Sequence, residues 1–175
     1  MVHDSVDPRK ILLLKKLSNI PRNINQLREN HNLIEFVLHE LCHEDCLNLK
    51  KAAYLVDNKD FDCLHGVVGI DKTEPFIHTN IWQAPDDFSA YMKTATFNTK
   101  VRQLKHKSHA NLSEKEIDLL EELSHELGMN RLKHFTVPLK YDNQGILLYE
   151  SVNDDAIEEN DLLSGLSFLS ICPLF

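Results

Sequence analysis

Residues 111–150 constrain the fold more than any other stretch, because they combine the signals of one helix and two strands in a fixed order. Ser113 and Glu116 form a Ser-x-x-Glu capping box, in which each side chain satisfies a free backbone donor at the start of a helix. Apolar residues then recur at helical spacing, namely Ile117, Leu120, Leu123 and Leu127. Gly128 follows at the position of a left-handed C-terminal cap, so we expect the helix to end there.

The second half of this stretch predicts a β-hairpin. Apolar residues alternate as in a half-buried strand, namely Phe135, Val137, Leu139 and Tyr141. Residues 142–145 (Asp-Asn-Gln-Gly) have the composition of a turn, and residues 146–149 are apolar enough to form the returning strand. A helix followed by two such strands is typical of the second half of a small sensor domain.

The rest of the chain alternates between helical and strand patterns. Further helices are expected at residues 8–17, with a break at 20–23, from Asn32 in pieces to Val56, from Ala84 onward, and at 157–171. Further strands are expected at residues 61–70 and 76–82, and a polar loop at 105–111. Few strands, arranged as hairpins with helices between them, indicate an α+β fold. We expect one domain over residues 1–175, with a helical N-terminal extension over residues 1–30 and an α/β/α sandwich around a central antiparallel sheet.

Composition excludes several classes of protein. The formal net charge of −8 at pH 7 repels phosphate, so this domain alone is expected not to bind nucleic acid. No run approaches the roughly 20 apolar residues of a membrane helix, and the N-terminus lacks a secretory signal, so we expect a cytosolic protein that does not bind membranes. The cysteines are too few and too irregular for a disulfide scaffold and are interpreted as reduced thiols: Cys42, Cys46, Cys63 and Cys172.

Three short motifs follow one another in the order of a known family. They are residues 61–66 (Phe-Asp-Cys-Leu-His-Gly), Thr79-Asn80 followed by Pro85, Phe88 and Tyr91, and Leu127-Gly128 followed by Thr136-Val137-Pro138-Leu139. In this order they resemble the autoinducer-binding domain of LuxR-type quorum-sensing regulators. The resemblance covers residues 32–171 and implies a GAF/PAS-like α/β/α sandwich.

In that family, a pocket between the sheet and one helix layer binds an acyl-homoserine lactone. The resemblance implies such a pocket here. Tyr91 matches the family's pocket tyrosine, whereas Phe88 stands near its tryptophan and has no N–H to donate. Lys100-Val101 replaces the family's aspartate-proline pair, which favours another small apolar signal, or regulation without a ligand, as alternatives to the lactone. The expected ligand-binding residues are Tyr91, Trp82, Phe88, Phe76 and Thr136.

The resemblance also implies a non-enzymatic homodimer that regulates transcription. The family's helix-turn-helix DNA-binding domain has no counterpart in these 175 residues, which fits a truncated regulator or one that acts without DNA. Under this interpretation we expect no catalytic residue, no cofactor and no bound metal.

Two alternatives come from other classes. His39-Glu40-Leu41-Cys42-His43 is a literal His-Glu-x-x-His, in which two histidines one helical turn apart could hold zinc and Glu40 could act as a general base. This pattern predicts a metal-dependent hydrolase, although so short a motif arises by chance in a chain with ten histidines. The second alternative is a protein-interaction module that uses the apolar C-terminal helix.

Overall fold

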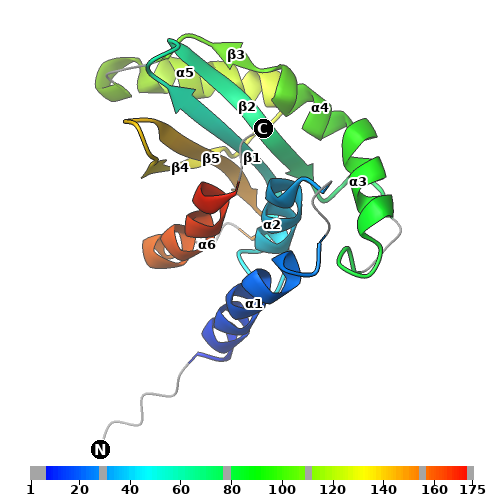
Figure 1. Cartoon of the computed structure of the whole chain (residues 1–175). Helices are drawn as coiled ribbons and strands as arrows, with labels where there is room; N and C mark the ends of the chain where they lie inside the picture. The colour runs from blue at the N-terminus through cyan, green and yellow to red at the C-terminus, as the bar shows by residue number, and fades with distance from the viewer. Residues whose placement is uncertain (1–6, 28–30, 77–79, 109–111, 154–156, 173–175) are drawn as a thin grey trace, which may run out of the picture.

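The computed structural model describes residues 7–27, 31–76, 80–108, 112–153 and 157–172, and for residues 112–117 it describes the backbone alone. The helices are α1 (Pro8–Ile24), α2 (Leu33–Cys42), α3 (Pro85–Thr94), α4 (Thr96–Gln103), α5 (Leu112–Leu127) and α6 (Glu159–Ile171). The strands are β1 (Leu49–Asn58), β2 (Cys63–Asp71), β3 (Lys105–His106), β4 (Lys133–Pro138) and β5 (Gln144–Ser151). They form one antiparallel sheet in the order β3-β2-β1-β5-β4 (Figure 1).

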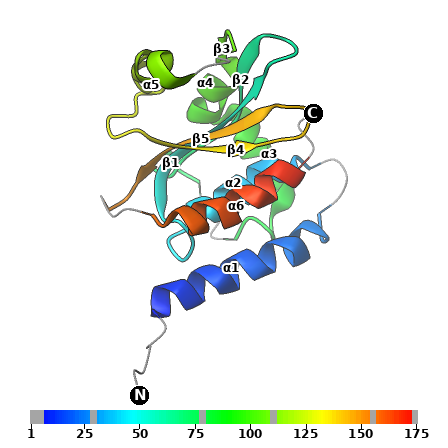
Figure 2. The ribbon, with the colours of Figure 1, turned by 90° about the vertical axis from the view of Figure 1, so that its left-hand side faces the viewer.

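Two layers of helices cover this sheet, as Figure 2 shows. α1, α2 and α6 enclose a first core on one face, and α4 and α5 enclose a second core on the other. β1 supplies both cores because successive side chains of a strand point to opposite faces. Tyr54 and Val56 belong to the first core, and Ala53 and Leu55 belong to the second. The α+β class and the α/β/α sandwich predicted from the sequence are therefore confirmed.

Helix α4 lies directly against the outer edge of β2. A Cβ atom at Gly66 would overlap the carbonyl group of Val101, and one at Gly69 would lie 2.5 Å from Val101 Cγ2. The backbone N–H of Gly66 donates to the carbonyl oxygen of Leu104 over 3.2 Å, and that of Gly69 donates to Asn98 Oδ1 over 2.9 Å. An uncovered strand edge would leave such groups unpaired. The two glycines allow a helix to pair with them instead.

One expected element was assigned to the wrong class. Helical character was predicted to continue in pieces to Val56, but residues 49–58 form the central strand β1. β1 is buried on both faces, so its apolar residues are nearly continuous and show no period of two. Helical spacing among Leu49, Ala52, Ala53 and Val56 was therefore coincidental.

A second expected strand, residues 76–82, is also wrong over the part that the structure describes. Residues 81–83 form a turn, in which the Asn80 side-chain oxygen accepts from the backbone N–H of Trp82 over 3.0 Å. Such a bond mimics a backbone turn and competes with strand pairing. Residues 77–79 of this prediction lie outside the described residues.

Smaller differences concern the ends of helices. α1 does not break at residues 20–23 but continues through Pro21 to Ile24, and it buries Leu13, Leu17 and Ile20 in the first core. Asn32 makes no side-chain cap bond at the start of α2. The expected loop at 105–111 contains the short strand β3. The capping-box side chains of α5 lie outside the described part of the chain, whereas Gly128 takes the predicted left-handed conformation at φ 63°.

Within residues 7–27, 31–76, 80–108, 112–153 and 157–172, no helix is both long and apolar enough to cross a bilayer.

The contact between α4 and β2 leads to a stability prediction. Gly66→Ala should lower the free energy of unfolding by about 3 kcal/mol, because the new methyl group meets rigid helix backbone. Gly165→Ala is the control, since its Cβ would lie 2.9 Å from the movable end of the Leu41 side chain and should change the stability by less than about 1 kcal/mol. Urea unfolding measures both, and equal midpoints for the two variants would contradict the tight contact.

Candidate functional site

A cluster of aromatic rings joins α2 to the segment that follows β2. Phe88 lies at its centre, with ring centroids 4.8 Å from Phe36, 5.0 Å from His39 and 5.5 Å from Phe76. Trp82 packs 5.2 Å from Phe36. These tilted and edge-on contacts are the arrangements that aromatic rings prefer. We call these rings, together with Tyr91, the ring cluster.

The segment is held in place by its own sequence. Pro85 stands in the first turn of α3, where its missing N–H leaves no partner unsatisfied, and Asp86 and Asp87 follow in the same turn. Phe88 and Tyr91 are three residues apart on that helix, so both point to the same side. The Tyr91 ring lies 4.7 Å from that of Phe76.

A cavity of about 170 Å³ opens beside the ring cluster. It is lined by His39, Ile70, Asp71, Lys72, Glu74, Phe76 and Tyr91. The lining combines rings with charged side chains, at the point where β2 ends. Cavities with an apolar wall and a few convergent polar groups are typical of small-molecule sites.

His39 is the polar group of α2 in this cavity wall. Burial lowers the pKa of His39 to about 4, against the smaller raising effect of the Glu40 carboxylate, so the imidazole is neutral at pH 7. Its Nδ1 atom is buried and has no hydrogen-bond partner among the residues that the structure describes. An unsatisfied buried polar atom costs about 1–3 kcal/mol, so a ligand that bonds to it would recover that free energy.

Glu74 and Tyr91 contribute two further polar groups to the wall. Glu74 Oε1 and Oε2 accept from the backbone N–H groups of Phe97 and Thr96, over 2.6 and 3.1 Å, and so hold the start of α4. Burial raises the pKa of Tyr91, and the negative charges of Glu74 and Asp71 and a hydrogen bond to Glu74 act in the same direction. The phenol therefore stays protonated, and because its O–H donates to Glu74, its oxygen remains able to accept a hydrogen bond.

The structure brings together four of the five predicted ligand-binding residues. Phe76 and Tyr91 line the cavity, while Phe88 and Trp82 belong to the ring cluster behind it. Thr136 lies apart, because it pairs with Ile146, whose side chain is in the second core on the opposite face of the sheet. His39 was missed as a cavity residue, although its spacing from Phe36 places both on one side of α2.

Among the described residues, the structure adds no third ligand to His39 and His43 of the His39-Glu40-x-x-His43 motif. α2 ends at Cys42, and His43 is its C-cap with extended backbone. The Nδ1 atom of His43 accepts from the backbone N–H of Asp45, and Glu40 faces Lys16 at 3.4 Å. Within the described residues, His39 and His43 belong to no group of three metal-ligating side chains.

All four cysteines are free, as the sequence predicted. Burial raises the pKa of the Cys46 thiol to about 12 and that of Cys172 to about 11, and it holds the pKa of Cys42 far above its usual range. A reactive cysteine needs a lowered pKa. These three thiols are therefore unreactive core residues.

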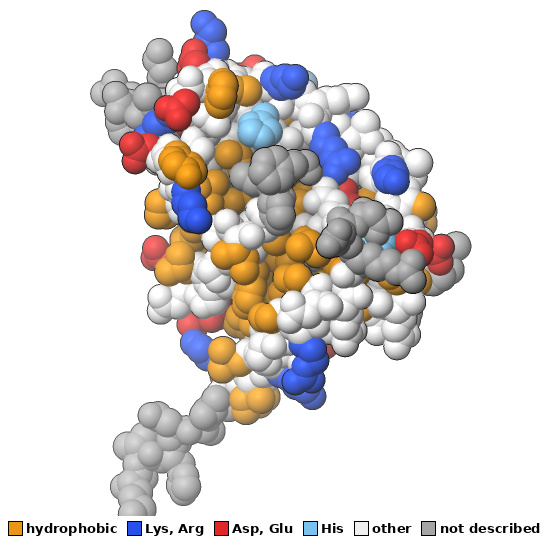
Figure 3. Space-filling view, in the orientation of Figure 1, with side chains coloured by type: hydrophobic (Ala, Val, Ile, Leu, Met, Phe, Trp, Pro, Cys, Tyr) orange, Lys and Arg blue, Asp and Glu red, His pale blue; other side chains and the backbone are white. Residues whose placement is uncertain are grey.

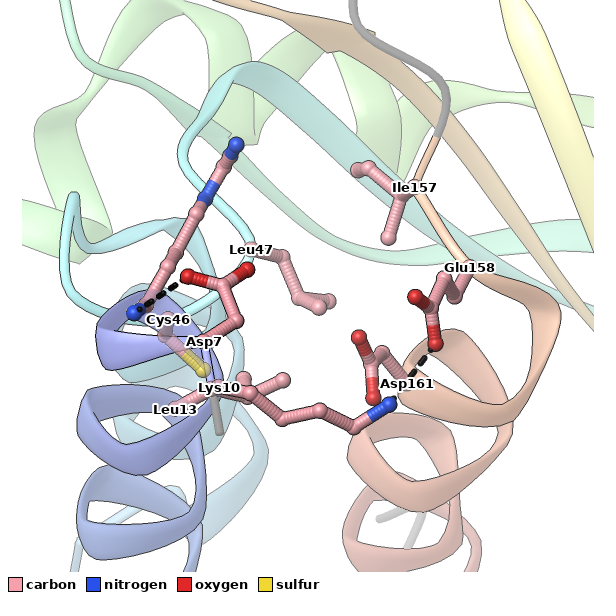
Figure 4. A pocket seen from close by; sticks show the side chains of 9 residues that line it. Asp7, Lys10, Leu13, Cys46, Leu47, Ile157, Glu158 and Asp161 are labelled. Atoms are coloured by element: carbon pink, nitrogen blue, oxygen red, sulfur yellow. Dashed lines mark hydrogen bonds and ion pairs between the residues drawn. The ribbon is translucent and has the colours of Figure 1, made fainter. Parts of the chain in front are cut away.

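A second cavity, of about 120 Å³, lies between α1 and α6 (Figure 4). Lys10 Nζ reaches across it to Glu158 Oε2 at 2.8 Å, and Asp7 accepts from the backbone of Arg9 over 3.0 Å. Its polar groups therefore pair with one another. A wider groove of about 630 Å³ along α5 and residues 128–132 is open to solvent. The cavity beside the ring cluster is the better candidate, because it combines rings with an unpaired buried atom.

Comparison with known proteins supports the fold. No protein-family model matches the chain, and no curated protein sequence matches it. Among solved structures, the chain is similar to the GAF domain of a phosphoenolpyruvate-protein phosphotransferase from Coxiella burnetii. The TM-score is 0.53 at 13% sequence identity, over 93% of this chain and 90% of that one. The chain therefore has a GAF-like fold.

The buried imidazole gives a pH prediction. The pKa of His39 is lower in the folded protein than in the unfolded chain, so its contribution to stability is complete above pH 6.5 and is lost as the pH falls toward 4. Between pH 7.5 and 4.5, the wild type should lose about 2–3 kcal/mol more free energy of unfolding than His39→Leu. Urea unfolding at the two pH values measures this. Parallel losses in the two proteins would mean that His39 titrates normally.

Proposed function

We propose that this chain is a regulatory domain that senses a small molecule, and that the signal binds in the cavity beside the ring cluster. The observation that carries the proposal is the unpaired Nδ1 atom of His39 in the wall of a ring-lined cavity. The GAF-like fold is compatible with signal sensing. The neutral imidazole can accept or donate one hydrogen bond, and the oxygen of the Tyr91 phenol, whose proton bonds to Glu74, can accept another.

The size of the cavity narrows the class of ligand. A volume of about 170 Å³ is below the roughly 300–1,000 Å³ of drug-sized sites, so the signal is a small planar or short-chain molecule. Lys72 and Glu74 in the lining favour a polar head group, while Phe76 favours an apolar or aromatic body.

The more specific form of the proposal is a cytoplasmic LuxR-type transcription regulator that binds an acyl-homoserine lactone. Tyr91 stands at the position of the family's pocket tyrosine, although its O–H bonds to Glu74 in this structure. Trp82 does not line the cavity, so the donor that Phe88 lacks would have to come from the imidazole of His39. The small cavity favours lactones with short acyl chains over long ones.

Native mass spectrometry of the whole chain, with a panel of acyl-homoserine lactones and small aromatic acids and amides, tests binding. Retention of one ligand per chain is expected. Tyr91→Phe and His39→Leu should each weaken binding on the order of tenfold, because each removes one hydrogen bond. Tyr141→Phe is the matched control, since Tyr141 is 83% exposed and distant from the lining.

The outcomes separate the two levels of the proposal. A retained aromatic molecule without any lactone would support the sensor and exclude the LuxR-type ligand. No retained ligand, or equal weakening by Tyr141→Phe, would contradict binding in this cavity.

We also propose that the chain acts as a homodimer through α1 and α6. Hydrophobic side chains gather over α2 and α6 on the face seen in Figure 3. Helices α1 and α6 carry large exposed apolar residues: Ile11, Leu12, Leu14, Leu163 and Ile171. Large apolar side chains exposed on two neighbouring helices commonly mark a protein interface.

Leu14→Glu tests the dimer without touching either core, because Leu14 is 56% exposed. Light scattering after size-exclusion chromatography should give a dimer for the wild type and a monomer for this variant. Phe61→Glu is the control, since Phe61 is 80% exposed in the β1–β2 turn and should leave the dimer intact. A monomeric wild type would overturn the proposal.

A further inference from the structure

A histidine from one element and two glutamates from another meet on the face of the sheet that carries the second core. They are His106 of β3 and Glu122 and Glu126 of α5. One ligand atom from each lies within 4.8 Å of the other two. The Nε2 atom of His106 is 3.0 Å from Glu126 Oε2, and its Nδ1 atom is 4.0 Å from Glu122 Oε1.

The fold positions the imidazole and leaves the carboxylates free to adjust. His106 pairs with Leu64 of β2, so its backbone is part of the sheet, and its side chain is only 15% exposed. Glu122 and Glu126 are four residues apart on α5 and therefore lie on one helix face. Their side chains are 60% and 42% exposed, so small rotations can bring both oxygens to one nitrogen.

The protonation chemistry of this group leaves room for a cation. Both ring nitrogens of His106 face carboxylates, and ionised carboxylates only accept hydrogen bonds. A neutral imidazole carries a single N–H, so it satisfies one carboxylate and leaves its other nitrogen lone pair facing the second. A positive charge removes this conflict, either as a second proton on the ring or as a metal ion between the lone pair and the carboxylates.

We propose that His106, Glu122 and Glu126 form a binding site for a divalent transition-metal ion of the Zn²⁺ or Mn²⁺ type. One imidazole and two carboxylates suit these ions, whereas Mg²⁺ and Ca²⁺ prefer oxygen ligands alone. Three protein ligands leave coordination positions for water. The ion ties the edge strand β3 to α5 and stabilises that side of the molecule. This site is independent of the ring-cluster cavity.

The test uses the whole chain after treatment with a chelator. Isothermal titration with Zn²⁺ should give one ion per chain, and Co²⁺ should give a visible d–d absorption band. His106→Gln and Glu126→Gln should each weaken Zn²⁺ binding on the order of tenfold or more. Glu121→Gln and His125→Gln are matched controls, because they remove the same groups from exposed positions of α5 outside the cluster, and they should keep the wild-type affinity.

Zn²⁺ should also raise the melting temperature of the wild type and of the two controls, but not that of His106→Gln. Should His106→Gln fail to fold, the double variant Glu122→Gln/Glu126→Gln decides, since both side chains are at the surface. Absence of saturable Zn²⁺ binding by the wild type would overturn the proposal. Wild-type affinity in Glu126→Gln or the double variant would overturn it as well, because the ion would then lie elsewhere.

Discussion

The close contact between α4 and the edge of β2 is the constraint on which the candidate site depends. Asn98 of α4 is almost fully buried and uses both ends of its amide, since Oδ1 accepts from Gly69 N–H and Nδ2 donates to the carbonyl of Met92 over 2.7 Å. One side chain thereby joins the sheet edge, the end of α3 and α4. Any side chain at Gly66 or Gly69 would separate these elements.

Other polar contacts extend this connection around the edge of the sheet. Arg102 of α4 donates to the Val67 carbonyl and reaches Glu35 of α2, with Nη2 2.6 Å from Oε1. Burial nevertheless raises the pKa of Glu35 more than the Arg102 charge lowers it. Glu74 holds the start of α4 by two backbone hydrogen bonds. The segment that carries the ring cluster is therefore fixed at both ends, and the cavity beside it has a defined shape.

The sequence predicted the fold class because its strongest signals were local. Gly128 after a periodic helix depends on neighbours in the chain and was placed correctly. The turn predicted at residues 142–145 exists but lies at 140–143, because residues 144 and 145 already pair in β5. β1 was misassigned because burial on both faces removes the alternation that identifies a strand. Burial on both faces is a property of the assembled sandwich, and no single segment encodes it.

The difference between local sequence patterns and contacts made only in the assembled fold also explains which site residues could be predicted. Phe88 and Tyr91 share a helix face, so their proximity follows from spacing. Thr136 was included by resemblance alone, and strand pairing places it on the other face of the sheet. The position of His39 beside Phe88 requires α2 and α3 to meet across more than 40 residues, and only the tertiary structure shows this. The metal-type cluster at His106 depends on a strand of two residues that sequence patterns do not detect.

Helix α2 connects the cavity with the opposite side of the molecule. His39 faces the cavity, while the neighbouring Glu40 pairs with Lys16 of α1. Under the proposed function, a ligand on His39 would act on the helix that packs against α1 and α6, where the proposed dimer surface lies. The proposed signal site and the proposed dimer surface are thus connected through α2.

Chemical-shift mapping by NMR tests the central claim most directly. A library of small polar aromatic fragments would be titrated into the ¹⁵N-labelled chain, and amide shifts would be followed for every residue. The account predicts saturable shifts concentrated at the end of α2, the end of β2 and α3, together with a shift of the His39 ring nitrogens. Shifts confined to the α1–α6 cavity, or no saturable shifts at all, would contradict it.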